Sequence, residues 1–205
     1  MLFLWRIKGP IMRIFIATLL LLAVFTQSYA QSYQTRTGYL YVHSSSKFME
    51  VKADNYQVFG SLNFETNEVK VNGLMKSFEF ELGALDQAFN SDRLDLSGYP
   101  KFKYEGLIET PENIDLNKAG TYTADVKGDL FIGEHKRVTS AVASFTVDAN
   151  GSMEVVVDFS FQIEEESLEI VNQLMKERLP SLISLDVNKL GISRDVVVHL
   201  SMSLK

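Results

Sequence analysis

Cysteine is absent from the 205-residue sequence. Disulfide bonds, thiolate metal sites and thiol catalysis are therefore excluded, as is a bacterial lipoprotein anchor, which needs a cysteine at its cleavage site. Histidine is scarce: His43, His135 and His199 lie far apart, without the short spacing that is typical of metal-ligand pairs. We expect no metal site and no cofactor of that kind.

Basic residues are too few for a nucleic-acid partner. Three of the 20 lysine and arginine residues fall within residues 1–30, which contain no acidic residue. The remainder, 31–205, has 17 basic against 26 acidic residues, a net charge of −9. Phosphate binding requires clustered lysine and arginine, so this balance argues against nucleic acid. We expect no nucleic-acid partner and leave a homodimer open.

The N-terminal segment has the features of a secretory signal. Its basic residues precede an apolar run, 14–25, which is shorter than the ~18 residues expected of a membrane-spanning helix. Small residues at Ser28 and Ala30 then match a signal-peptidase site. We predict a signal peptide over 1–30, with Met12 as a possible true start, and a periplasmic or secreted protein without an integral membrane span after cleavage. The alternative is a retained N-terminal anchor.

Alternation of apolar and polar residues dominates the remainder of the chain and predicts strands. Five apolar residues at every second position of 153–161, for example, would share one face of a strand. We expect eight to ten strands, with their centres in the segments 39–43, 57–64, 68–71, 77–81, 102–105, 122–126, 129–132, 141–147, 153–161 and 195–204.

Turn and helix signals divide these strands. Residues 65–67 and 148–152 read as hairpin turns, the second because Asn-Gly tolerates the positive φ that such turns demand. Residues 85–89 have helical character, and apolar residues three and four apart predict an amphipathic helix over 166–182. The sequence therefore predicts one all-β domain, 31–205: an antiparallel barrel or sandwich with one or two short helical insertions.

Several segments, in order along the chain, resemble the YceI-like family. Residues 76–80, 89–90 and 99–106 are similar to its strand, short helix and Tyr-Pro return strand. Residues 120–132 resemble its Gly-x-Leu-x-Ile strand, and 192–204 its closing segment. The chain departs from the family in the turn after Ile132, which lacks the usual proline, and in its long helical insertion.

The resemblance implies an eight-stranded, lipocalin-like periplasmic barrel that holds an amphiphilic lipid, such as an isoprenoid or a quinone, in its lumen. An elongated apolar ligand needs a wall of aromatic and aliphatic side chains with few polar groups. The candidate wall residues are Tyr39, Tyr41, Phe48, Phe59, Phe78, Phe80, Phe102, Tyr104, Phe145, Val157, Phe159 and Phe161. From periodicity alone, the same side chains could instead fill a closed core, because protein interiors normally close-pack.

Nothing in the sequence points to catalysis. Three consecutive acids, 164–166, are typical of a helix N-terminus. Glu79 and Glu81 alternate with phenylalanines and should face water, and no nucleophile elbow or phosphate-binding loop is present. We expect a binding protein and not an enzyme. The alternatives are a structural or interaction protein of the same fold with a filled core and a surface partner site and, with less support, an outer-membrane barrel.

Overall fold

The structure is a computed structural model, and it describes residues 32–45, 50–90, 100–133, 135–162 and 194–205. The predicted signal peptide 1–30, Phe48 and the predicted helix 166–182 lie outside the described residues. Strands make up most of the described chain: β1 (Ser32–Ser45), β2 (Glu50–Asn63), β3 (Glu68–Leu74), β4 (Glu79–Phe80), β5 (Lys101–Ile108), β6 (Gly120–Ile132), β7 (His135–Val147), β8 (Met153–Gln162) and β9 (Asp195–Leu204).

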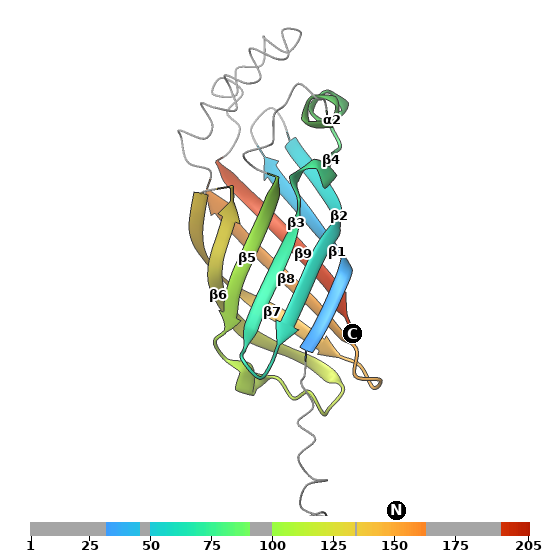
Figure 1. Ribbon diagram of the computed structural model, residues 1–205, viewed down its shortest axis with the longest axis vertical. Coiled ribbons are helices and arrows are strands. Elements are labelled where there is room, and N and C mark those ends of the chain that lie inside the picture. Colours follow the sequence, from blue (N-terminus) through green and yellow to red (C-terminus); the bar gives the residue numbers. More distant parts are fainter. Residues whose placement is uncertain (1–31, 46–49, 91–99, 134, 163–193) are drawn as a thin grey trace, which may run out of the picture. The chain divides into compact units, whose positions relative to one another are not determined.

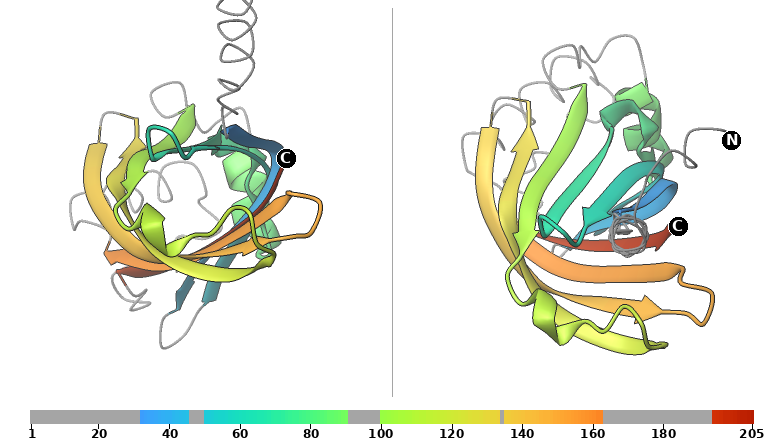
Figure 2. Two further views of the ribbon diagram at one scale, coloured as in Figure 1. Left: turned by 90° about the horizontal axis from the view of Figure 1, so that it is seen from below. Right: turned by 60° about the horizontal axis from the view of Figure 1, so that its bottom comes forward.

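Eight of these strands close into an antiparallel barrel (Figures 1 and 2). Their order is β1-β9-β8-β7-β6-β5-β3-β2, and β1 pairs with β2 to complete the ring. The two-residue β4 adds to β2 outside this order. Closure gives each of the eight strands a paired neighbour on both sides, which is how a barrel of this size limits edge-to-edge aggregation. The predicted antiparallel barrel is confirmed, and the sandwich is excluded.

Three short helices lie between the strands of the described part of the chain. Helix α2 (Gly83–Asn90) follows β4 and contains the predicted helical segment. The 3-10 turns η2 (Met75–Ser77) and η3 (Pro111–Asn113) lie before β4 and between β5 and β6. The clean alternation of 77–81 therefore forms only a two-residue strand, because η2 occupies its start.

Two tight turns, β2–β3 and β7–β8, lie where the sequence predicts hairpins. The β2–β3 turn has Asn67 at φ 58°, and the β7–β8 turn has Gly151 at φ 79°. In the second turn, Asp148 Oδ1 accepts hydrogen bonds from the backbone N–H groups of Asn150 and Ser152, both at 2.8 Å. Such an aspartate cap stabilises the left-handed geometry that the turn requires.

A buried asparagine fixes a bulge in β2. Asn55 is fully buried; its Oδ1 accepts the backbone N–H of Gln57 at 2.9 Å and its Nδ2 donates to the carbonyl of Leu74 at 3.0 Å. On one side of this bulge β2 pairs with β4, and on the other side with β3. The side chain thus satisfies backbone groups at the point where β2 changes partner, as buried polar groups normally require.

One end of the barrel is closed by large side chains. Phe145, Leu62, Met153, Met202 and Leu204 are fully buried there, and all five lie near the strand ends that carry the β2–β3 and β7–β8 turns. Met202 packs so closely on Gly60 that a Cβ at residue 60 would lie 2.2 Å from its sulfur. This end therefore has the dense packing of a normal protein core.

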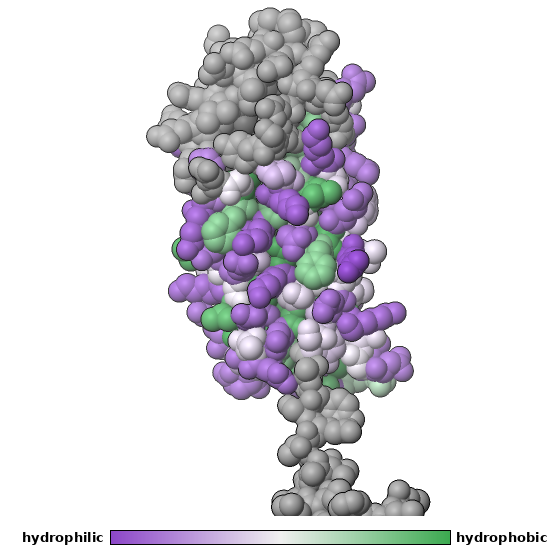
Figure 3. Space-filling model, viewed as in Figure 1, coloured by the Kyte–Doolittle hydropathy of each residue, from purple (hydrophilic) through white to green (hydrophobic). Residues whose placement is uncertain are grey.

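The outer surface has the opposite character. Figure 3 shows mainly hydrophilic residues over the visible face of the barrel, with isolated apolar residues between them. Ion pairs such as Lys103–Glu105 at 2.9 Å and Lys70–Glu68 at 3.1 Å lie along β5 and β3. Glu79 and Glu81 are exposed, as the alternation predicts. The barrel is polar outside and apolar inside.

Candidate ligand-binding lumen

A cavity of about 680 Å³ lies inside the barrel. This volume falls within the range of about 300–1,000 Å³ that small-molecule sites occupy. Phe145, Leu62 and Met202 form its floor. Its upper wall consists of residues at the opposite strand ends: Ser44, Val51, Ile132, His135, Phe161 and Val196. The lumen is therefore closed below and extends toward the end where the longer connections lie.

Small residues create this space. The inward positions of β7 carry Phe145 near the floor, but Ala143, Ala141 and Thr139 above it. On β6, Gly128 pairs directly with Thr139, and β5 lies so close that a Cβ at residue 128 would be 2.3 Å from the carbonyl oxygen of Glu105. The dense packing of the floor therefore does not continue upward along β7.

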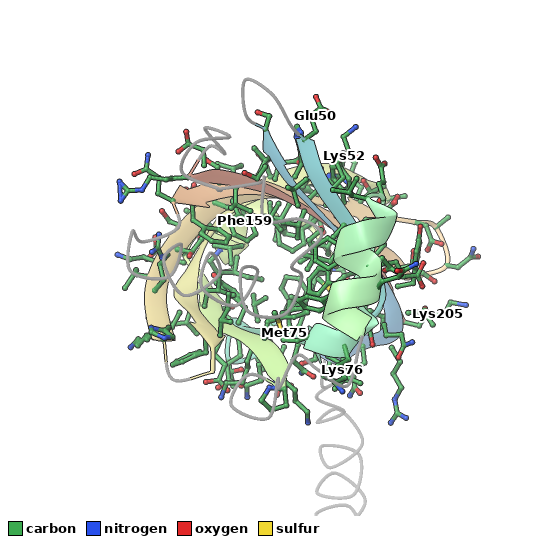
Figure 4. All side chains as sticks on the ribbon, turned by 90° about the horizontal axis from the view of Figure 1, so that it is seen from above. Glu50, Lys52, Met75, Lys76, Phe159 and Lys205 are labelled. Carbon is green, nitrogen blue, oxygen red and sulfur yellow. The ribbon has the colours of Figure 1, made fainter. Side chains whose placement is uncertain are left out.

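Helix α2 contributes to the mouth of the lumen. Asp86 Oδ1 accepts the backbone N–H of Phe80 at 3.1 Å, which ties the helix to β4. The rings of Phe80 and Phe89 then pack with centroids 4.9 Å apart, and both side chains line the cavity. Seen from this end, Phe159 and Met75 point into the central hollow, whereas Glu50 and Lys52 point away from it (Figure 4).

The wall is almost entirely apolar. Phe78 and Phe102 pack with ring centroids 5.8 Å apart, and Phe159 and Phe161 at 6.4 Å. Few of the described lining residues are polar. They are Ser44, Tyr104, Thr139 and three basic residues at the mouth. Burial, and then the nearby charges of Asp129 and Glu109, raise the pKa of Tyr104 to about 12, so its hydroxyl stays protonated at neutral pH.

Basic side chains gather where β7 begins. His135, Lys136 and Arg137 line the cavity at this end. Lys136 pairs with Asp129 at 2.8 Å, and the Arg137 guanidinium lies over the Phe161 ring, 5.5 Å from its centroid. Apolar depth with charged groups at the mouth suits an amphiphile whose chain enters the lumen.

Arg137 also bridges a split in the barrel wall. Among the described residues, β7 and β8 pair from Ala143–Val157 to Val147–Met153, and their remaining portions toward the mouth are unpaired with each other. Arg137 Nη1 donates a hydrogen bond across this split to the carbonyl of Gln162. The wall is thus least continuous beside the small residues of β7.

Eight of the twelve predicted wall residues line the cavity. They are Phe78, Phe80, Phe102, Tyr104, Phe145, Val157, Phe159 and Phe161. Four of them lie between residues 78 and 104, and the other four lie on β7 and β8. In these segments the apolar residues occupy one face, so the alternation indicates which face points inward. Phe48 lies outside the described residues.

Tyr39, Tyr41 and Phe59 do not line the cavity, which corrects the predicted inward faces of β1 and β2. Leu40 and Val42 line it in place of the tyrosines. Both faces of β1 are apolar in this stretch, and register shifts on either side of Gly38 change which face points inward. In β2, Val58 is fully buried and Gly60 packs on Met202, so Phe59 between them faces outward.

Tyr39 makes its contacts on the outer face of the barrel. Tyr39 Oη donates to Asp54 Oδ1 at 2.6 Å, and its ring stacks on Tyr56 with centroids 5.2 Å apart. This hydrogen bond, and to a smaller extent burial, raises the pKa of Tyr39 well above its ordinary value. Its burial therefore reflects packing on the outer surface.

Several lining residues were not predicted. The inward face of β9 supplies Val196, Val198, Leu200 and Met202, and α2 supplies Phe89. The sequence of β9 alternates clearly, but its inward side chains are all aliphatic. The predicted wall consists of aromatic residues apart from Val157, so it does not include them. Phe89 belongs to the segment 89–90 that resembles the family's short helix, but nothing in the sequence marks its side chain as part of the wall.

Within the described ranges, no group of three histidine, cysteine, aspartate or glutamate side chains could hold a metal ion. No helix among those residues is long and apolar enough to span a membrane.

Comparison with known proteins shows a likeness in structure only. No family model matches the sequence, and no curated protein matches it. The fold does match a solved polyisoprenoid-binding domain from Saccharophagus degradans, which is implicated in plant cell wall breakdown. The TM-score is 0.66 at 13% identity, over 86% of this chain and 99% of that one. The chain therefore has the closed antiparallel barrel fold of that domain.

Two further structures complete the comparison. BcnA of Burkholderia cenocepacia aligns to this barrel with a TM-score of 0.50 and 9% identity, over 82% of this chain and 96% of that one. A YCEI protein of Campylobacter jejuni aligns with a TM-score of 0.41 and 13% identity, over 78% of this chain and 82% of that one. The first supports the shared fold, and the second is too distant to add to it.

Proposed function

We propose that this chain is an exported, divergent YceI-like protein that holds the apolar chain of an amphiphilic lipid, such as an isoprenoid or a quinone, in the barrel lumen. The observation that carries the proposal is the cavity of about 680 Å³ with its almost wholly apolar wall. A cavity this large with so apolar a wall favours a hydrocarbon chain, since each buried methylene contributes about 0.8 kcal/mol to the free energy of binding.

Two further observations support it. The solved domain that matches most of this chain is described as binding polyisoprenoids. The first 30 residues have the pattern of a cleavable signal, which fits a carrier or buffer of lipid outside the cytoplasm. The proposal involves binding without covalent chemistry.

The competing function is an interaction protein whose lumen is filled. The described side chains fill only the floor of the barrel and leave the space above Phe145 and Met202 open. A filled core would place large side chains at Ala141 and Ala143. The lipid-binding proposal therefore accounts for the small residues of β7, and the alternative does not.

The test is native mass spectrometry of the full chain expressed in a bacterium and purified from the periplasm. We expect a polypeptide mass that begins at residue 31, with an additional lipid-sized mass that organic-solvent extraction removes and recovers as a lipid. A bare polypeptide mass that persists after incubation with isoprenoid quinones and fatty acids would exclude lipid binding. A chain that stays in the cytoplasm with residues 1–30 attached would exclude export.

A further inference from the structure

The strands β7 and β8 pair with each other only near the floor of the barrel. Among the described residues, their pairing runs from Val147–Met153 to Ala143–Val157 and does not continue toward the mouth. On their other sides the same strands are fully paired, β7 with β6 through all 13 of its residues and β8 with β9 through all ten. Each strand is therefore held by one neighbour along the split that separates residues 135–142 from 158–162.

Side chains on both edges of the split line the cavity. Ala141 of β7 and Phe159 of β8 are the first inward positions beyond the last paired residues, and both belong to the cavity wall. Nearer the mouth, Arg137 donates its hydrogen bond to the carbonyl of Gln162, and its guanidinium lies over the Phe161 ring. A side-chain contact thus joins the two edges where a backbone ladder would otherwise do so.

The outer face beside the split is apolar on the β7 side. Val138 and Val142 are 65% and 60% exposed, more than any other large apolar side chain that the structure describes. The outward residues on the β8 side are polar and exposed: Asp158, Ser160 and Gln162. An apolar chain at the split would therefore find contacts along β7, first with the outer valines and then with the cavity wall.

The barrel wall can widen at the split more easily than elsewhere. Opening a fully paired seam such as β6–β7 breaks a ladder of backbone hydrogen bonds, each of which contributes to stability. In the described part of the split there is no such ladder, and the printed contact across it is the single hydrogen bond of Arg137. Local opening is most frequent where few contacts oppose it.

We propose that the apolar chain of the ligand enters and leaves the lumen sideways, through the split between β7 and β8, and that Arg137 holds this split closed. The inference rests on the proposed lipid-binding function and adds the route by which the lipid reaches its site. A chain that enters sideways passes between Ala141 and Phe159 directly into the widest part of the wall. Such a gate sets the rates of binding and release without altering the bound state.

The test is a covalent tether across the split. Continuing the register of the paired section places Ser140 opposite Ser160, and both are exposed on the outer face. Because the chain has no cysteine, Ser140→Cys/Ser160→Cys joined by a short bis-maleimide gives one defined link, which mass spectrometry verifies. Stopped-flow fluorescence then measures the uptake of parinaric acid and its release to phospholipid vesicles. We expect the link to slow both rates by roughly tenfold and to leave the Kd unchanged, since it hinders passage in both directions equally.

Thr146→Cys/Glu154→Cys, linked in the same way, is the matched control. These residues are directly paired and exposed on the outer face of the same two strands, so linking them should leave both rates at the wild-type values. Wild-type rates in the protein linked at 140 and 160, or slower uptake with unchanged release, would overturn sideways entry while leaving the lipid-binding lumen intact. Failure of the wild type to bind parinaric acid would overturn both proposals.

Arg137→Met gives an independent measurement without a tether. Methionine keeps an apolar contact with Phe161 but removes the hydrogen bond to Gln162. Uptake and release should both become faster by roughly 2- to 10-fold, the range of one net hydrogen bond. Unchanged rates in this variant would overturn the role of Arg137 in holding the split closed.

Discussion

A single substitution should close the lumen without harming the fold. Ala141 lines the cavity between Thr139 and Ala143, where the wall has its smallest residues. A tryptophan at residue 141 would project its indole into the cavity and displace roughly five methylene-sized groups of a bound chain. At about 0.8 kcal/mol per methylene the loss is about 4 kcal/mol. Since 1.4 kcal/mol is tenfold in affinity, the Kd should rise about 1,000-fold.

The assay uses parinaric acid, a polyene fatty acid whose fluorescence increases in an apolar site. Val142→Trp is the matched control, because Val142 is the next residue of β7 and is 60% exposed on the outer face. We expect Ala141→Trp to abolish the fluorescence increase and Val142→Trp to retain it. Ala141→Trp should unfold at the same or a higher denaturant concentration, since its indole gains apolar contacts. Equal binding by the two variants would refute the lumen as the binding site.

Three other predictions follow from the packing and from the pKa of Tyr104. Thr139→Val should raise the free energy of unfolding of the ligand-free protein by about 1 kcal/mol, because it removes an unpaired buried hydroxyl; a denaturant midpoint at or below that of Thr139→Ser would contradict this. In urea titrations, Phe145→Ala should lower the free energy of unfolding by about 3–5 kcal/mol, because Phe145 is fully buried in the floor. Phe159→Ala should lower it clearly less, because Phe159 borders the cavity. Equal losses for the two variants would argue for a filled barrel. Because the folded pKa of Tyr104 is about 12 and its ordinary value is 10, its contribution to stability is complete below pH 10 and lost as the pH rises to 12. Unfolding measured from pH 9 to 12 should therefore show a smaller decrease for Tyr104→Phe than for the wild type.

The strands whose faces differ clearly in polarity were predictable from the sequence. Residues 153–161 and 195–204 alternate cleanly, and their apolar positions point inward as β8 and β9. A shift of the strand register by one residue would place five apolar side chains in water, so the pattern allows only one inward face. Alternation predicts these strands, but by itself it left a barrel and a sandwich open.

β1 shows where that reasoning fails. Tyr39 and Tyr41 alternate with Leu40 and Val42, so either face could be buried, and the register shifts around Gly38 are set by pairing with β2. Tyr39 is accommodated outside by Asp54, a residue 15 positions away that local sequence does not connect to it. Long-range contacts of this kind decide the inward face, and alternation does not encode them.

The cavity itself could not be predicted either. The sequence shows that many apolar residues alternate, but not whether they meet across the barrel. The space lies beside Thr139, Ala141 and Ala143 of β7, and whether larger side chains of other strands fill it depends on several separate pairing registers. The difference between a closed core and an open lumen therefore lies in the tertiary arrangement of small residues.

The most direct test of a ligand within the lumen is contact quenching of a single tryptophan. The sequence has one tryptophan, Trp5, which lies in the predicted signal peptide, so the mature chain provides a dark background. Phe159→Trp would place the fluorophore on the cavity wall, and Tyr56→Trp would place it on the outer surface, where Tyr56 is 57% exposed. A fatty acid brominated on its apolar chain should quench the first strongly and leave the second unchanged. Equal quenching of both, or quenching of the outer tryptophan alone, would show that lipid binds outside the barrel and contradict the account.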